Sequence, residues 1–169
     1  ILSSADQQQP PIRLGLRLIK GLSEAAGQRI HTAQRQRAFA NVADLRQRAC
    51  LDRGDMEALA AADALSGISG NRYQSHWQTM ALEAHRPLLP YDSAAQRSQD
   101  DAAVTAAPTL PEDVVADYQS TGLTLRSHPL SLLRHQPPFD RCRRQTELET
   151  LGNHRFVRVA GLVLSLIHI

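Results

Sequence analysis

Cysteine, aromatic residues and long apolar runs are all scarce in this chain of 169 residues. Its two cysteines, Cys50 and Cys142, lie far apart in the sequence, which excludes a disulfide scaffold and a zinc knuckle. Aromatic residues make up 4% of the chain, and the apolar fraction of 42% is dominated by alanine and leucine. This composition favours helices over a sandwich or barrel. We therefore predict a mainly α fold.

An excess of charge of one sign is also lacking, because 19 basic residues stand against 17 acidic ones. The net charge of +2 excludes a histone-like or polyanion-like protein. No apolar stretch is long enough to span a membrane, and the first residues have neither the basic start nor the apolar run of a signal peptide. We expect a soluble, cytoplasmic protein with no membrane partner, and we suspect a fragment.

The charges are distributed unevenly along the chain. Residues 12–82 carry ten basic and six acidic residues, residues 83–120 carry two and seven, and residues 121–169 carry seven and three. The acidic stretch is also rich in proline, serine and alanine, with almost no periodic apolar pattern. The pattern predicts a basic helical block, an extended or disordered acidic linker and a basic tail.

Apolar residues recur at helical spacing in two stretches of the basic block, and this spacing predicts one buried stripe in each. The stripes are Met56, Leu59 and Ala60, and Tyr73, Trp77, Met80 and Ala81. Asn41 is placed to cap a helix beginning at Val42, and Asp55 to cap the helix that holds Met56.

The most informative stretch, residues 16–30, has the pattern of a helix-hairpin-helix: an apolar helix, a tight turn at Gly21, Leu22 and Ser23, and a second helix. Gly21 can adopt a positive φ, and exposed N–H groups at the start of the second helix would bind a phosphate oxygen. Lys20 and Arg29 could add positive charge beside that phosphate. The small Gly27 is expected to permit close packing.

Residues 39–59 indicate a second helix, turn and helix, which adds Arg53 and Gly54 to the predicted backbone-binding residues. Paired hairpins can grip two strands of a duplex. An ordinary αα-hairpin remains open, because Ser23 stands where such turns usually have a second glycine and tolerates a positive φ less well.

The tail is different in character. Pro129 suits the first turn of a short helix, and residues 156–163 alternate and are rich in valine, as in a half-buried strand. A single strand is not stable alone, so the sheet it would join is expected outside this chain.

Signals for catalysis or metal binding are weak. The seven histidines include no pair at metal-ligating spacing beside a carboxylate, and no nucleophile elbow or phosphate loop occurs. The acidic pairs Asp100–Asp101 and Glu112–Asp113 lie in or beside the linker. We predict no catalytic residue and no metal ligand in this chain.

Several motifs in order nevertheless resemble a known family. Residues 13–22, 57–65 and 71–77 are similar to the C-terminal part of the error-prone DNA polymerases of the bacterial C family, which are related to the replicative DNA polymerase III alpha subunit. Residues 117–125 and 128–130 resemble the stretch after the linker there, and residues 157–163 resemble the opening strand of its OB-fold.

The resemblance implies template-directed DNA synthesis in damage-induced mutagenesis, with duplex DNA, the sliding clamp and accessory mutagenesis proteins as partners. It also implies Mg²⁺ for the parent polymerase, whose catalytic palm would lie upstream of this chain, so this fragment should be inactive alone. A different possibility is a stand-alone helical protein-interaction module with no nucleic-acid role.

The sequence thus predicts five segments. They are a flexible lead-in at 1–11, a helix-hairpin-helix DNA-binding domain at 12–82, a linker at 83–116, connecting helices with the first strand of a truncated OB-fold at 117–163, and an unassigned tail at 164–169.

Overall fold

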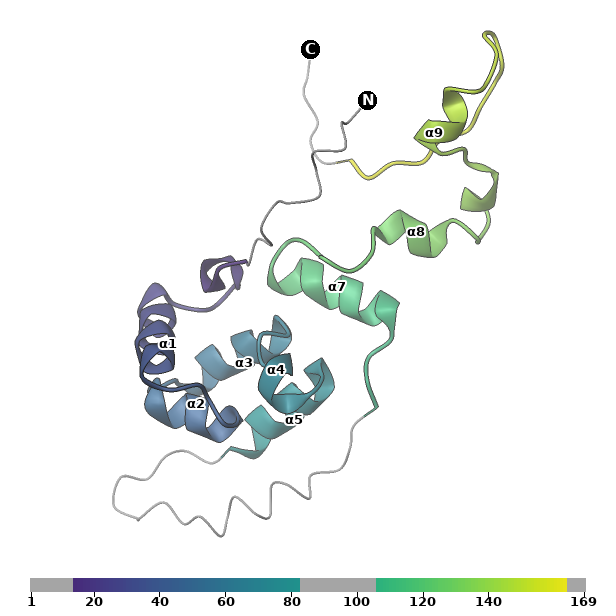
Figure 1. The fold of residues 1–169 in the computed structure, drawn as a ribbon. Coiled ribbons are helices and arrows are strands. Elements are labelled where there is room, and N and C mark those ends of the chain that lie inside the picture. Colours follow the sequence, from purple (N-terminus) through teal and green to yellow (C-terminus); the bar gives the residue numbers. More distant parts are fainter. Residues whose placement is uncertain (1–13, 83–105, 164–169) are drawn as a thin grey trace.

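The computed structural model describes residues 14–82 and 106–163, and within these ranges the chain is mainly helical, as predicted, with no strand (Figure 1). The predicted lead-in and residues 164–169 lie outside this part. The elements are η2 Leu16–Leu18, α1 Glu24–Gln36, α2 Val42–Arg48, α3 Arg53–Ala61, α4 Ser66–Ser69, α5 Arg72–Ala81, α7 Leu110–Ser120, α8 Pro129–Leu133, η3 Phe139–Arg141 and α9 Gln145–Leu148.

One hydrophobic core joins the elements from η2 to α4, and α5 packs against α3 and α4 beside it. We call the elements from η2 to α5 the helical block. Three of the turns between these elements contribute to the core, since Ile19, Leu51 and Leu65 are all buried. The predicted stripe of α3 is confirmed, because Met56, Leu59 and Ala60 are at most 2% exposed. The core therefore holds the two predicted hairpins against each other.

Polar side chains cap most helices of the block. Ser23, Asn41, Asp52 and Asn71 each accept a hydrogen bond from the backbone N–H three residues on, at the starts of α1, α2, α3 and α5. Such a cap stabilises a helix by about 1 kcal/mol. The predicted cap at Asn41 is confirmed. The one at Asp55 is wrong, because Asp52 takes that role and the Asp55 side chain is buried.

The predicted core stripe of α5 is also wrong. Tyr73, Trp77 and Met80 are 40%, 56% and 52% exposed. The buried residues of this helix are instead Arg72, Ser75 and Thr79. Arg72 reaches two carboxylates of α7, and the Ser75 hydroxyl donates to the Asn71 carbonyl at 2.9 Å. Helical spacing identifies a stripe but not which face of the helix meets the protein, and here polar partners turn the other face inward.

Helix α7 packs against α3 of the helical block (Figure 1). It begins at Leu110 with a capping box, in which the Glu112 carboxylate accepts hydrogen bonds from the Thr109 N–H and hydroxyl at 2.8 Å. This helix crosses the predicted border between linker and connecting helices at residue 116. Residues 110–116 of the predicted linker thus belong to a docked helix and are not extended. The division into domains stays a prediction.

The tail after α7 leads away from the helical block (Figure 1). Pro129 lies in the first turn of α8, as its position predicts. Residues 156–163 form no strand, and Phe156 is fully exposed. A strand needs neighbours to satisfy its backbone groups, and no neighbouring strand lies in the described part of the chain. The truncated OB-fold is thus not seen here.

No helix in the described residues is both long enough and apolar enough to cross a membrane.

Candidate nucleic-acid interface

The first hairpin turns at an exposed Gly21 between η2 and α1. Gly21 has φ of 86°, in the left-handed region, and the buried Ile19 anchors the turn to the core. A Cβ built at Gly21 would lie 3.8 Å from the Cβ of Ala58, an ordinary contact. The backbone conformation, and not lack of space, is therefore the reason for glycine here.

Ser23 needs no positive φ, since its φ is −73° and it caps α1. Its hydroxyl accepts a hydrogen bond from the Ala26 N–H at 3.1 Å. The N–H groups of Glu24 and Ala25 lie in the first turn, where no helical carbonyl reaches them. Those of Gly21 and Ser23 make no backbone hydrogen bond to another described residue. The bend thus presents several free donors at the positive end of a helix dipole.

The second hairpin joins α2 to α3 through a turn at residues 49–52. Cys50, with φ of 49°, is the left-handed residue of this turn. Arg53 and Gly54 are exposed and form the first two positions of α3, beyond the turn itself. Their N–H groups are again those that a helix leaves unpaired at its start. In both hairpins, therefore, the turn leads into a helix N-terminus with free N–H donors.

The two hairpins form one packed unit. Gly21 lies beside Ala58, in the middle of α3. From α1, Arg29 donates to the Ala49 carbonyl at 2.8 Å and to the Asp55 carboxylate at 3.3 Å, both next to the second turn. These two contacts show that Arg29 joins the hairpins. They help to fix the position of the start of α1 relative to the start of α3.

The predicted cations are largely engaged within the protein. The Lys20 ammonium donates to the Gln119 and Tyr118 carbonyls at 2.9 and 3.2 Å. Arg53 pairs with Glu57 at 2.7 Å, although its side chain is 71% exposed. Leu22, between Gly21 and Ser23, packs against the core and contributes its backbone position only. The backbone donors of the bend, and not these side chains, are its most available groups.

Two features near the first bend escaped the sequence analysis. Arg17, in the last turn of η2, is exposed and makes no ion pair with a described residue. It lines a surface hollow that Ser23 and His31 also line, at the start of α1. The position of Arg17, four residues before Gly21, was the available signal.

The expected close packing at Gly27 is wrong, because a Cβ there would meet nothing within 4 Å.

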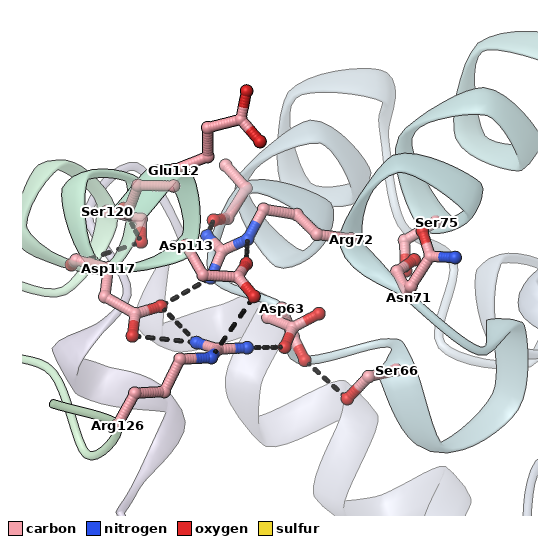
Figure 2. A network of polar contacts seen from close by, with 12 residues as sticks. Asp63, Ser66, Asn71, Arg72, Ser75, Glu112, Asp113, Asp117, Ser120 and Arg126 are labelled. Carbon is pink, nitrogen blue, oxygen red and sulfur yellow. Dashed lines mark hydrogen bonds and ion pairs between the residues drawn. The ribbon is translucent and has the colours of Figure 1, made fainter. Parts of the chain in front are cut away.

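A partly buried ionic network joins α7 and the loop after it to the helical block (Figure 2). Arg72 pairs with Asp113 at 3.1 Å and with Asp117. Arg126 pairs with Asp117 at 2.8 Å, with Asp113 at 3.3 Å and with Asp63 at 2.6 Å. Asp113 and Asp117, four residues apart on one helical face, were the sequence signal for such a cluster. We call these five residues the α7 network.

The pKa of Asp117 lies below its ordinary value. Burial alone would raise it, but hydrogen bonds from Thr124, Arg126 and Arg72 to the ionised form outweigh that effect. Since the folded pKa is depressed, the carboxylate stabilises the fold above its unfolded pKa of about 4. This stabilisation is lost as the pH falls through the lower folded pKa.

We accordingly expect the free energy of unfolding to fall as the pH is lowered from 6 to about 3, and Asp117→Asn to flatten this dependence. The measurement is urea unfolding, followed by circular dichroism, at a series of pH values. An asparagine variant with the full pH dependence of the unchanged chain would contradict the assignment.

No group of three or more His, Cys, Asp or Glu converges to hold a metal ion anywhere in residues 14–82 or 106–163.

Comparison with known proteins agrees with this geometry. Residues 2–75 match the helix-hairpin-helix motif family. The helical block is thus similar to the helix-hairpin-helix motif, and the match includes both hairpins described above. No solved structure matches the chain.

The full chain is similar to error-prone DNA polymerases. It is 44% identical over 165 residues to that of Saccharophagus degradans, covering 96% of this chain and 16% of the relative. Identity to the Teredinibacter turnerae enzyme is 43% over 164 residues, with the same coverage, and identity to that of Ralstonia nicotianae is 47% over 158 residues, covering 92% of this chain and 14% of the relative.

The chain is therefore related to the error-prone DNA polymerases, as its motifs predict, and it spans about a sixth of the length of these relatives.

Proposed function

We propose that the helical block binds duplex DNA through its sugar-phosphate backbone, as part of the C-terminal region of an error-prone DNA polymerase. The observation that carries this proposal is the exposed left-handed bend at Gly21, which opens into the N-terminus of α1 with free N–H donors. A second helix start with free donors, at Arg53 and Gly54, belongs to the same packed unit.

Free donors at a helix N-terminus bind phosphate because the N–H dipoles and the helix dipole both favour negative charge. Phosphate contacts fix the position of a duplex and carry no sequence information. Reading bases would instead require a helix in the major groove with suitable side chains. We infer that the block holds the duplex without regard to its sequence and supports synthesis carried out elsewhere in the parent protein.

The contacts of the acidic residues in α7 favour a structural role for them and not a catalytic one. Asp113 and Asp117 are occupied by the guanidinium groups of Arg72 and Arg126, and Glu112 caps its own helix. Carboxylates held this way do not fit a Mg²⁺ site, which needs free oxygens. We propose that nucleotidyl transfer and its Mg²⁺ belong to other parts of the parent polymerase, whose role would be translesion synthesis.

Two further proposals depend only on the relationship to these polymerases. The parent protein is expected to bind the sliding clamp and accessory mutagenesis proteins, and it is expected to act in the cytoplasm.

The salt dependence of binding tests this function. If about four phosphates are engaged, log affinity should fall with log salt at a slope of roughly −3.5, and scrambling the duplex sequence should change the affinity little. The measurement is fluorescence anisotropy of a labelled duplex at several salt concentrations. Absence of binding at low salt, or a strong preference for one sequence, would count against the proposal.

Arg17 provides a local test of the surface. Arg17→Glu should weaken duplex binding and lower the magnitude of the salt slope by about 1, because one phosphate contact is lost. Arg35→Glu is the matched control: it makes the same change of charge on an exposed residue at the opposite end of α1. Equal losses in the two variants would show that net charge alone attracts the DNA.

A second candidate function is a protein-interaction module, which the exposed Trp77 and Met80 on α5 favour. In that case a partner captured from the cell should remain bound after nuclease treatment, and Trp77→Ala should release it while duplex affinity is unchanged.

A further inference from the structure

The C-terminal end of α7 lies directly against the bend of the first hairpin. The Lys20 N–H donates to the Ser120 carbonyl at 2.8 Å. The Lys20 ammonium donates to the Gln119 carbonyl at 2.9 Å and to the Tyr118 carbonyl at 3.2 Å. Backbone and side chain of one residue therefore hold three successive carbonyls of α7, although the two segments are far apart in the sequence.

These contacts suit both partners. The last carbonyls of a helix have no intrahelical donor and lie at the negative end of its dipole, so an ammonium group stabilises them. Lys20 directly precedes Gly21, whose left-handed conformation directs the chain into α1. Fixing Lys20 therefore fixes where the bend begins.

Docking of α7 depends strongly on charge. Val114 is its one buried hydrophobic residue among those described, while Val115 is 56% exposed. The α7 network supplies ionic contacts, from Arg72 in α5 and from Arg126 beyond α7 (Figure 2). In addition, the Thr124 hydroxyl donates to the Asp117 carboxylate at 2.7 Å.

We propose that α7 is a positioning element for the DNA-binding bend: the α7 network docks the helix, and its C-terminal carbonyls hold Lys20 so that the donors around Gly21 face the DNA. Lys20 is then a positioning residue and not a phosphate ligand. This proposal rests on the proposed function, and it makes duplex affinity depend on residues far from the DNA.

Salt dependence separates positioning from direct contact. In the full chain, Lys20→Gln and Arg126→Gln should each weaken duplex binding about tenfold with an unchanged salt slope, since neither removes a cation that neutralises a phosphate. The double variant should bind no more weakly than the worse single one, because both act through the same docked helix. Arg155→Gln, an exposed arginine of the tail, is the charge-matched control and should bind as the unchanged chain does.

Two outcomes would overturn the proposal. One is unchanged affinity in Arg126→Gln. The other is a smaller salt slope in Lys20→Gln with additive losses in the double variant, which would make Lys20 a phosphate ligand. Thr124→Val removes one hydrogen bond of Asp117 and the acceptor of the Arg126 N–H but keeps both arginines. It should produce a smaller loss in the same direction and guards against a general folding defect.

Hydrogen exchange tests the positioning without DNA. In Arg126→Gln the Lys20 amide should exchange at least tenfold faster, because its acceptor is the Ser120 carbonyl, while the Ile30 amide in α1 should keep its protection. Unchanged exchange at Lys20 would overturn the proposal even if DNA binds. If exchange rises at Lys20 but the unchanged chain binds no duplex, the proposed function fails and the docking of the bend by α7 stands.

Discussion

Replacing Arg72 by alanine is expected to lower the free energy of unfolding by about 3 kcal/mol, because it leaves the two largely buried carboxylates of Asp113 and Asp117 with Arg126 as their only arginine partner among the described residues. The Arg72 side chain is only 7% exposed, and its partners Asp113 and Asp117 are 14% and 11% exposed (Figure 2). Arg72 also donates to the Ala61 carbonyl, at the end of α3. The loss therefore affects both the docking of α7 and the packing of α5 on α3.

Urea unfolding followed by far-ultraviolet circular dichroism measures this effect. Arg53→Ala is the control, because it removes an arginine that is paired at i,i+4 with Glu57 and whose side chain is 71% exposed. Such a pair contributes about 0.5 kcal/mol or less. If the two variants lose equal stability, the α7 network does not act as a buried ionic cluster.

Gly21→Val is expected to weaken duplex binding by tenfold or more and to cost about 1 to 3 kcal/mol of stability. Valine is strongly disfavoured at a φ of 86°, so the bend must change its conformation and its N–H donors no longer converge. A Cβ at this site would make only an ordinary contact, since its nearest atom lies at 3.8 Å. Backbone strain is thus the main effect expected of the variant.

Anisotropy of a labelled duplex at fixed salt measures the affinity, and urea unfolding measures the stability. The control is Gly67→Val, at a glycine of α4 without a positive φ and with nothing within 4 Å of its Cβ. That variant should bind as the unchanged chain does. Full affinity in Gly21→Val would contradict the role proposed for the bend.

Features that depend on a few neighbouring residues could be predicted from the sequence. The apolar spacing of Met56 and Leu59 predicted their burial, and Asn41 before Val42 predicted a helix start. Gly21 between two apolar stretches predicted a left-handed turn. Each prediction depends on local backbone geometry or on periodicity within one helix, which sequence spacing expresses directly.

Features that depend on distant partners could not be predicted in this way. The sequence predicts Lys20 and Arg29 beside a phosphate, but it could not predict that Lys20 also meets the carbonyl end of α7 and that Arg29 meets the second hairpin. The stripe of α5 around Trp77 was expected inside, but Arg72 turns the other face toward α7. A charged side chain takes the partner that tertiary packing brings to it, and spacing along the chain does not contain that choice.

The amino-acid sequence by itself thus determined the mainly helical class, the hairpin bend and the relationship to the error-prone DNA polymerases, because these follow from local pattern and residue identity. Only the tertiary structure decided which donors stay free and which cations are engaged. For Lys20 that choice depends on the docking of α7, whose ionic partners lie in separate elements and meet only when the chain is folded.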